Sequence, residues 1–179
     1  MKKFFYILLL SLLSNAAFAQ QSIYIQVEGI KGESKDKNHA EWIDALAFSG
    51  GSSISVSTST GSGGASAGKA SVQDYTFSIC LDKSTNPLRM ANLQGTHIPK
   101  VTIEIEKPGA TPFVYYKIEL EDVLVSSISE GGSSGENKVF VNVSFNFARY
   151  KNTYFQQTPN GNIVIANFSN FDIQQNKAP

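Results

Sequence analysis

Apolar and polar residues alternate along four stretches of the chain: SIYIQVEG at 22–29, PKVTIEIEK at 99–107, VYYKIELEDV at 114–123 and KVFVNVSFNFARY at 138–150. Successive side chains of a strand point to opposite faces, so each stretch predicts a strand with one buried face and one solvated face. The residues expected in the core are Ile23, Ile25, Val27, Val101, Ile103, Ile105, Val114, Tyr116, Ile118, Leu120, Val139, Val141, Val143, Phe145 and Phe147.

Weaker strand signals lie at 42–49, 75–81 and 163–168. Turn-forming residues separate the runs, as in KPGATP at 107–112, GGSSGE at 131–136 and PNG at 159–161. Many short strands divided by such turns predict an all-β fold, a β-barrel-like arrangement of two packed antiparallel sheets.

The stretch STNPLRMANLQG at 84–95 breaks the alternation and predicts a short α-helix beside the barrel. Ser84 or Thr85 could cap its first turn, and Gly95 could end it in the left-handed conformation that glycine tolerates. Leu88, Met90, Ala91 and Leu93 are the residues that fit its apolar side.

The first nineteen residues have the order of a secretory signal peptide. Lys2 and Lys3 precede an apolar run at 4–13, and Ala17-Phe18-Ala19 offers the small residues that a signal peptidase reads. The run is shorter than the roughly 20 residues that span a bilayer, although a retained membrane anchor is the alternative. We expect cleavage after Ala19, leaving 20–179 as a single secreted or periplasmic domain without a membrane span.

Charge and cysteine content exclude several functions. Without Lys2 and Lys3 the chain keeps 13 basic residues against 15 acidic ones, so it lacks the basic excess that nucleic-acid binding requires. Cys80 is the one cysteine, so it forms no internal disulfide and no multi-cysteine metal site, and we expect it to be buried.

The glycine-rich stretch GSGGASAGKAS at 61–71 resembles two catalytic motifs. Residues 63–69 match the G-x-x-x-x-G-K part of a phosphate-binding loop, and 64–68 match the G-x-S-x-G nucleophile elbow around Ser66. Both motifs need a helix directly afterwards, whereas the following residues alternate like a strand, and Ala70 stands where a magnesium-binding hydroxyl belongs. We therefore expect a flexible loop that makes contacts and does no catalysis.

No other group of residues predicts an active site, a metal site or a cofactor. His39 and His97 lie in separate loops, where each is expected at the surface or in a local hydrogen bond. The carboxylates of Glu104, Glu106, Glu119 and Glu121 line the polar faces of two neighbouring strands. A pair of acids could serve a glycosidase, but their regular alternation indicates a solvated sheet face.

The chain resembles the haemolysin-coregulated protein (Hcp) family, the tube proteins of type VI secretion. The resemblance is carried by IYIQVEGIKGES at 23–34, HAEWIDALAFSGG at 39–51, AGKASVQDYTFS at 67–78, LDKSTNPL at 81–88, GTHIPKVTIEI at 95–105, YYKIELEDVLVSSISEGGSSGE at 115–136 and VNVSFNFARYKNTY at 141–154. It covers nearly all of the chain after the signal segment.

The resemblance implies a barrel-like β-fold with one short helix, and a structural function without enzymatic activity. Family members form hexameric rings that stack into a tube, can carry effector proteins in the bore, and act with spike and sheath components. The long glycine-bearing loop, here 57–70, would reach from one ring to the next. Its expected contact residues are Ser57, Gly61, Gly63, Gly64, Ser66, Gly68 and Lys69.

The signal segment departs from the family pattern, because tube proteins assemble in the cytoplasm and normally carry none. A misassigned start codon is one explanation. A second is a tube-like paralogue that works outside the cytoplasm. A third is a secreted ring used for adhesion or cargo binding, that is, an Hcp-like binding module that acts outside the cytoplasm without forming tubes.

Overall fold

The computed structural model describes residues 21–57, 66–109 and 111–178. Within them lie nine strands and one helix: β1 (Ser22–Val27), β2 (Ile43–Ser49), β3 (Ser52–Ser57), β4 (Ser66–Val72), β5 (Tyr75–Cys80), α2 (Thr85–Gln94), β6 (Ile98–Lys107), β7 (Phe113–Gly131), β8 (Phe140–Gln157) and β9 (Ile163–Asp172). The sequence-based prediction of an all-β fold with one short helix is confirmed. The predicted cleavage residues Ala17 and Ala19 lie outside the described residues.

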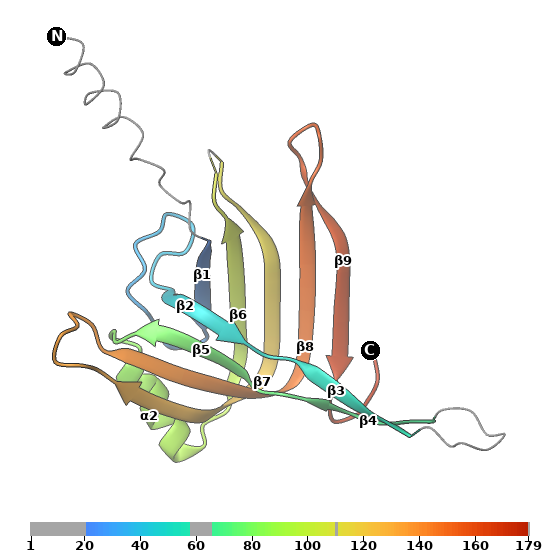
Figure 1. Cartoon of the computed structure of the whole chain (residues 1–179), viewed down its shortest axis with the longest axis horizontal. Helices are drawn as coiled ribbons and strands as arrows, with labels where there is room; N and C mark the ends of the chain where they lie inside the picture. Colours follow the sequence, from blue (N-terminus) through green and yellow to red (C-terminus); the bar gives the residue numbers. More distant parts are fainter. Residues whose placement is uncertain (1–20, 58–65, 110, 179) are drawn as a thin grey trace, which may run out of the picture.

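Six strands close a barrel, and β9 extends it. The antiparallel order β5-β2-β1-β6-β7-β8-β9 is completed by a second pairing of β8, with β5, which closes the ring of strands. Figure 1 shows β1, β6, β7, β8 and β9 standing side by side, and β2 and β5 lying across them. A closed barrel leaves few free strand edges, and the outer edge of β9 is one of them.

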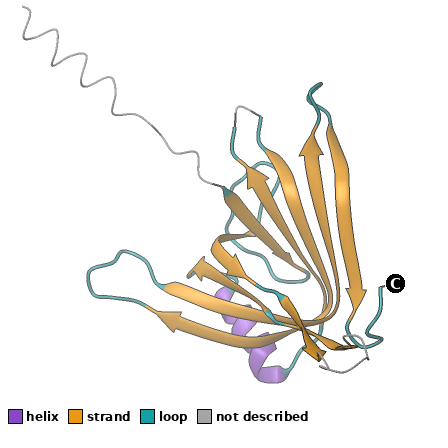
Figure 2. Cartoon of the chain, turned by 45° about the vertical axis from the view of Figure 1, so that its right-hand side comes forward, coloured by secondary structure: helices purple, strands orange, loops and turns teal. Residues whose placement is uncertain are grey.

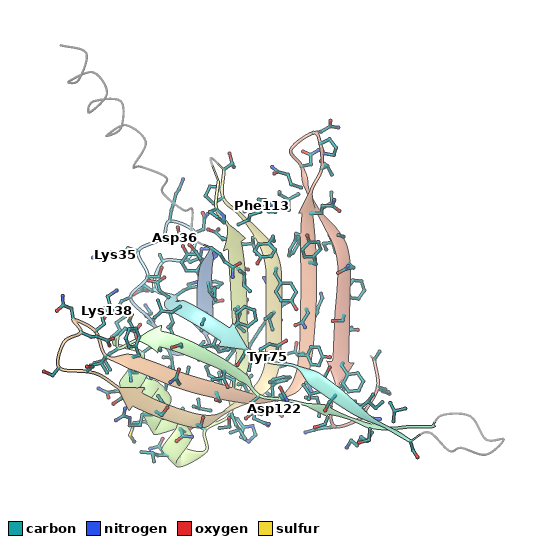
Figure 3. The ribbon with its side chains drawn as sticks, viewed as in Figure 1. Lys35, Asp36, Tyr75, Phe113, Asp122 and Lys138 are labelled. Atoms are coloured by element: carbon teal, nitrogen blue, oxygen red, sulfur yellow. The ribbon has the colours of Figure 1, made fainter. Side chains whose placement is uncertain are left out.

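Two long strands, β7 and β8, take part in both layers of the barrel. The first half of β7 pairs with β6 and with the second half of β8, and the second half of β7 pairs with the first half of β8. The bend falls at Asp122, which has a positive φ of 53° and which Figure 3 labels at the base of the sheet. His97 is exposed, as the sequence predicts, and its Nδ1 lies 2.7 Å from Asp122 Oδ1, a partner 25 residues away.

The predicted alternation places the core correctly along most of the barrel. Ile23, Ile25 and Val27 of β1 are buried, as are the three apolar residues expected on β6 and the alternating residues from Val141 to Phe147 on β8. Val139 is an exception, because it precedes β8 and is exposed. Cys80 is half-buried and not buried as predicted, because it alternates with the buried Ile79.

Helix α2 packs beside the second half of β7 (Figure 2). Leu88 and Ala91 are buried on its inner side. The Asn92 side-chain amide donates to the Val125 carbonyl of β7 at 2.7 Å, so this backbone oxygen has a hydrogen-bond partner outside the sheet. Met90 and Leu93 point outward, so the predicted four-residue apolar side was wrong for these two.

The ends of α2 agree with the sequence only in part. Gly95 adopts the left-handed conformation with φ 61° and stops the helix, as predicted. Ser84 precedes the helix without a side-chain cap, because its hydroxyl donates to Asp82 Oδ1.

Strands β3 and β4 form a two-stranded arm that extends away from the barrel (Figure 1). The prediction of an unstructured loop over 57–70 was therefore wrong for Ser57 and for the residues from Ser66 onward. The side chains of β3 are all exposed, including Ile54 and Val56, so the arm is held by backbone pairing and has no core of its own.

Gly50 sits between β2 and the arm, where its backbone lies against the Tyr75 ring. A Cβ at this position would overlap that ring, so Gly50→Ala is expected to destabilise the protein by about 1–3 kcal/mol, a typical cost of overpacking. Thermal unfolding followed by circular dichroism would measure the loss. Gly51→Ala is the matched control, since its Cβ would meet only the flexible Gln73 side chain; equal losses in both variants would contradict this explanation.

Candidate functional site

The first candidate site is the arm, which carries the residues expected at ring contacts. Ser57 and Ser66 are directly paired across β3 and β4, and Gly68 and Lys69 follow on β4 with exposed backbone and side chain. Gly61, Gly63 and Gly64 lie outside the described residues. The arm thus presents paired backbone and small side chains, a surface suited to contact.

Strand β4 stands where both catalytic motifs of the glycine-rich stretch would need a helix. A phosphate loop and a nucleophile elbow both place a helix directly after the motif. Here Ser66–Val72 is β4, and β5 follows it at Tyr75. Neither the helix N-terminus that would attract phosphate nor the sharp strand-to-helix turn is formed at this position.

The second candidate site is β9, whose apolar residues face solvent. Ile165 is 61% exposed and Phe168 is 62% exposed, and Ile163 and Val164 are also exposed. Neighbouring residues of a strand point to opposite faces, so Val164 and Ile165 together show that both faces of β9 are uncovered. Within the part of the chain that the structure describes, β9 pairs only with β8. An uncovered apolar edge strand is a template for association with another chain.

A third feature is a strap, residues 31–42, which folds over the outer face of β1 and β6. Its two ends pair through the backbone: Gly32 N–H donates to the Glu41 carbonyl at 2.7 Å, and Ser34 N–H donates to the Trp42 carbonyl at 2.9 Å. A Cβ on Gly32 would overlap the Trp42 carbonyl, so this close approach requires glycine. The strap covers the side of the sheet that the sequence predicts to be solvated.

His39 lies at the centre of the strap's contact with the sheet and is only 2% exposed. Its ring stacks on Tyr24 of β1 at 4.0 Å, and the Trp42 ring meets it edge-on at 4.8 Å. His39 Nδ1 lies 2.8 Å from Asp36 Oδ1, and His39 Nε2 lies 3.0 Å from Glu104 Oε2 on β6. The prediction of a surface position for His39 was wrong, although its local partner Asp36 fits the other predicted option.

Both ring nitrogens of His39 therefore face carboxylate oxygens. A neutral imidazole has one N–H and can donate to only one of them, whereas the imidazolium can donate to both. Glu104 also pairs with Lys117 of β7 at 3.0 Å through its other oxygen. Only the imidazolium could donate to Asp36 and to Glu104 at the same time.

Asp36 and Glu106, two acids that lie beside the His39 ring, have pKa values shifted in opposite directions. The pKa of Asp36 lies below its usual value, mainly because of the His39 hydrogen bond, with help from the backbone N–H groups of Asn38 and His39. The pKa of Glu106 is raised, mainly by burial, because Glu106 is 7% exposed under the strap. The prediction that Glu106 lines a solvated sheet face was therefore wrong, whereas Glu121 is exposed as predicted.

Ligand atoms of Asp36, His39 and Glu106 lie within 4.8 Å of one another, which raises the question of a metal ion. Asp36 Oδ1 already accepts the N–H groups of Asn38 and His39 at 2.8 and 3.0 Å and faces His39 Nδ1. A metal ion would have to displace the ring N–H from this oxygen. We therefore assign Asp36, His39 and Glu106 to a hydrogen-bonded histidine cluster and do not assign them as metal ligands.

The remaining predicted carboxylates form pairs across strands and no catalytic arrangement. Glu119 lies 2.6 Å from Lys100, and Glu121 accepts from Arg149 Nε at 2.9 Å. Among the described residues, no helix is long and apolar enough to cross a membrane.

Comparison with known proteins assigns the family. Residues 24–154 match the model of the family described as type VI secretion system effector, Hcp. The chain is 47% identical over 140 residues to protein hcp1 of Pseudomonas aeruginosa, a match that spans 78% of this chain and 86% of that protein.

Solved structures agree with this assignment. The fold matches Hcp1 from Salmonella typhimurium with a TM-score of 0.72 and 27% identity, over 89% of this chain and 99% of that one. A type VI secretion system effector from Yersinia pestis matches with a TM-score of 0.64 and 27% identity, over 84% and 98% of the two chains. A further type six secretion system protein has a TM-score of 0.83 at 24% identity, covering 89% of this chain and all of that one, and so shares the fold. The chain belongs to the Hcp family of type VI secretion proteins.

Proposed function

We propose that this protein is a non-enzymatic structural subunit that forms hexameric rings, and that these rings stack into a type VI secretion tube able to carry effector proteins in its bore. The observation that carries the proposal is β9, an edge strand with apolar residues exposed on both faces. In a ring, head-to-tail contacts bury the same two surfaces on every subunit and close on themselves. The free edge of β9 would be one of the two.

The arm is the proposed contact between rings. It extends beyond the barrel (Figure 1), and its exposed Ile54 and Val56 offer apolar area to a neighbouring ring. Few residues take part, so each contact is weak and the repeated stack supplies the strength. A stable ring contact, by comparison, needs roughly 1,000 Å² of buried surface.

Size-exclusion chromatography with light scattering tests ring formation. We expect a mass of about six times that of one subunit, the value for closed sixfold symmetry. A strict monomer at high protein concentration would contradict the proposal.

Shortening the arm is expected to weaken stacking and to leave rings intact. Ser57 and Ser66 are paired, so residues 58–65 can be replaced by Asn-Gly, the two-residue sequence preferred in tight hairpins. Electron microscopy of the variant should show single rings where the unchanged protein forms stacks. Stacks of unchanged length would show that the arm makes no contact between rings, and loss of the ring itself would place the arm within the ring.

The N-terminal segment favours a second candidate, a secreted Hcp-like binding module that acts outside the cytoplasm. Its support is the order of Lys2 and Lys3, the apolar run and the small residues Ala17 and Ala19. Sequencing the N-terminus of protein recovered from cells and medium separates the two functions. Gln20 as first residue favours the secreted module, and an intact Met1 in cytoplasmic protein favours the tube subunit.

A further inference from the structure

We propose that the strap, residues 31–42, is a pH-sensitive latch, which holds to the outer face of β1 and β6 while His39 is charged and releases as His39 loses its proton. The proposal is independent of ring formation. It rests on the position of a buried histidine between carboxylates that come from different elements.

Among the described residues, His39 makes ring and polar contacts from the strap to β1 and β6, stacking on Tyr24 and facing Glu104. Asp36 belongs to the strap itself, so its bond to His39 Nδ1 orients the ring (Figure 3 labels Asp36 on this segment). Glu104 belongs to β6, so its 3.0 Å contact with His39 Nε2 joins the strap to the sheet. The neutral ring keeps one N–H, so loss of the proton would leave two lone pairs facing each other at one of the two contacts, to Asp36 or to Glu104, and would turn that attraction into a repulsion.

The charges around His39 determine the direction of the switch. The titratable and charged groups that face the cluster are Asp36 of the strap, Tyr24 of β1, Asp44 of β2, Glu104 and Glu106 of β6 and Lys117 of β7. His39 and Lys117 are the cations, and Glu106 Oε1 lies 4.0 Å from His39 Nδ1. Without the imidazolium charge, Lys117, which pairs with Glu104, is the one cation left in this group beside four carboxyl groups, so rising pH loosens the strap.

The pKa of Glu106 acts in the same direction. Burial raises its pKa in the folded state, so the stability linked to its proton is present at low pH and is lost as pH rises through the folded value. Asp36 has the opposite sign: its lowered pKa contributes stability that is lost only when strongly acidic pH protonates it. Together the two acids favour a closed strap at mildly acidic pH.

The strap also contacts the segment that leads into α2. The Lys83 backbone N–H donates to Glu33 Oε1 at 3.1 Å, and Lys83 Nζ lies 3.7 Å from Glu41. Glu41 pairs with Lys31 within the strap as well, at 2.8 Å. Release of the strap would therefore free both the outer face of β6 and the start of the helix segment.

Trp42 provides the test, because it is the one tryptophan in the chain and lies 4.8 Å from the His39 ring. A charged imidazole beside an indole quenches its fluorescence. We expect the fluorescence of the purified protein to rise in a single step between about pH 5 and about pH 8, where histidine is able to change charge. Amide-exchange protection of Gly32, Ser34 and Glu41, corrected for the intrinsic pH effect, should fall at least about tenfold across the same step, while the amides of β5 stay protected.

Three variants decide the interpretation. His39→Asn should remove the step, and His97→Asn, which changes the exposed histidine, should retain it. Glu106→Gln should move the step to lower pH, because it removes a negative neighbour of the imidazolium. A flat fluorescence signal in the folded protein, a step that persists in His39→Asn, or unchanged protection of the strap would each overturn the latch.

Discussion

Replacement of His39 by alanine is expected to lower the free energy of unfolding by roughly 3–5 kcal/mol, the cost of removing one partner from a buried ion pair. The ring fills the space between the strap and Tyr24, and its two nitrogens face Asp36 and Glu104. Without it, these carboxylates and Glu106 remain close together under the strap with no cation from the strap. A domain of this size loses about 2–4 °C per kcal/mol, so the melting temperature should fall by about 6–20 °C.

His97→Ala is the matched control for this experiment. His97 also bonds to a carboxylate, with Nδ1 2.7 Å from Asp122 Oδ1, but it is exposed. Exposed pairs contribute only about 0–1 kcal/mol, so this variant should unfold nearly as the unchanged protein does. Circular dichroism melts at mildly acidic pH would compare the two. Similar melting temperatures for both alanine variants would show that the buried cluster does not stabilise the strap.

The barrel could be predicted from the sequence because its core strands are apolar on one face. The period of two in β1, β6 and β8 is a direct consequence of that burial. The bend in β7 is less evident in the sequence than the core strands are. The buried residues Leu120 and Val123 are three positions apart, so the alternation of apolar and polar residues is interrupted at Asp122. This shift of phase explains why the alternation ends at 123 although the strand continues to Gly131.

The arm could not be predicted in the same way, because the side chains of β3 are exposed and only the end of β4, at Val72, packs against the core among the described residues. Ile54 and Val56 alternate with serines in β3, but β4 contributes mostly small residues, and no core imposes a stronger pattern. The pairing of β3 with β4 is made by the backbone, which any sequence of small residues provides. A run rich in glycine and serine therefore looks like a loop whether or not it is paired.

The buried cluster was missed because the strap that covers it has no period at all. Glu104 and Glu106 occupy the polar positions of β6, and nothing near them in the sequence indicates a cover. The one local signal is Asp36 three residues before His39, a spacing at which the carboxylate bonds to backbone N–H groups and fixes a turn. The partner on β6 is 65 residues away and follows only from the fold.

A double substitution on β9, Val164→Lys with Ile165→Lys, is expected to convert the proposed ring into monomers. The two residues are adjacent and exposed by 44% and 61%, so one lysine would stand on each face of the edge strand. Lysine on an edge strand is a natural block to association, since burying its charge against a neighbour costs several kcal/mol, roughly 3 or more without a partner. Both sites are solvated in the single chain, so its unfolding should change little, by about 0.5 kcal/mol each.

Met90→Lys with Leu93→Lys is the matched control, because it adds the same two charges to exposed apolar residues on α2. Light scattering should give the mass of one subunit for the β9 variant and the mass of the ring for the α2 variant, with the same circular dichroism spectrum for both. A ring that survives the β9 lysines would move the subunit contact to another surface. If only the α2 lysines dissociate the ring, the subunit contact lies on the helix. Charged residues are depleted at the buried core of an interface and are tolerated at its rim.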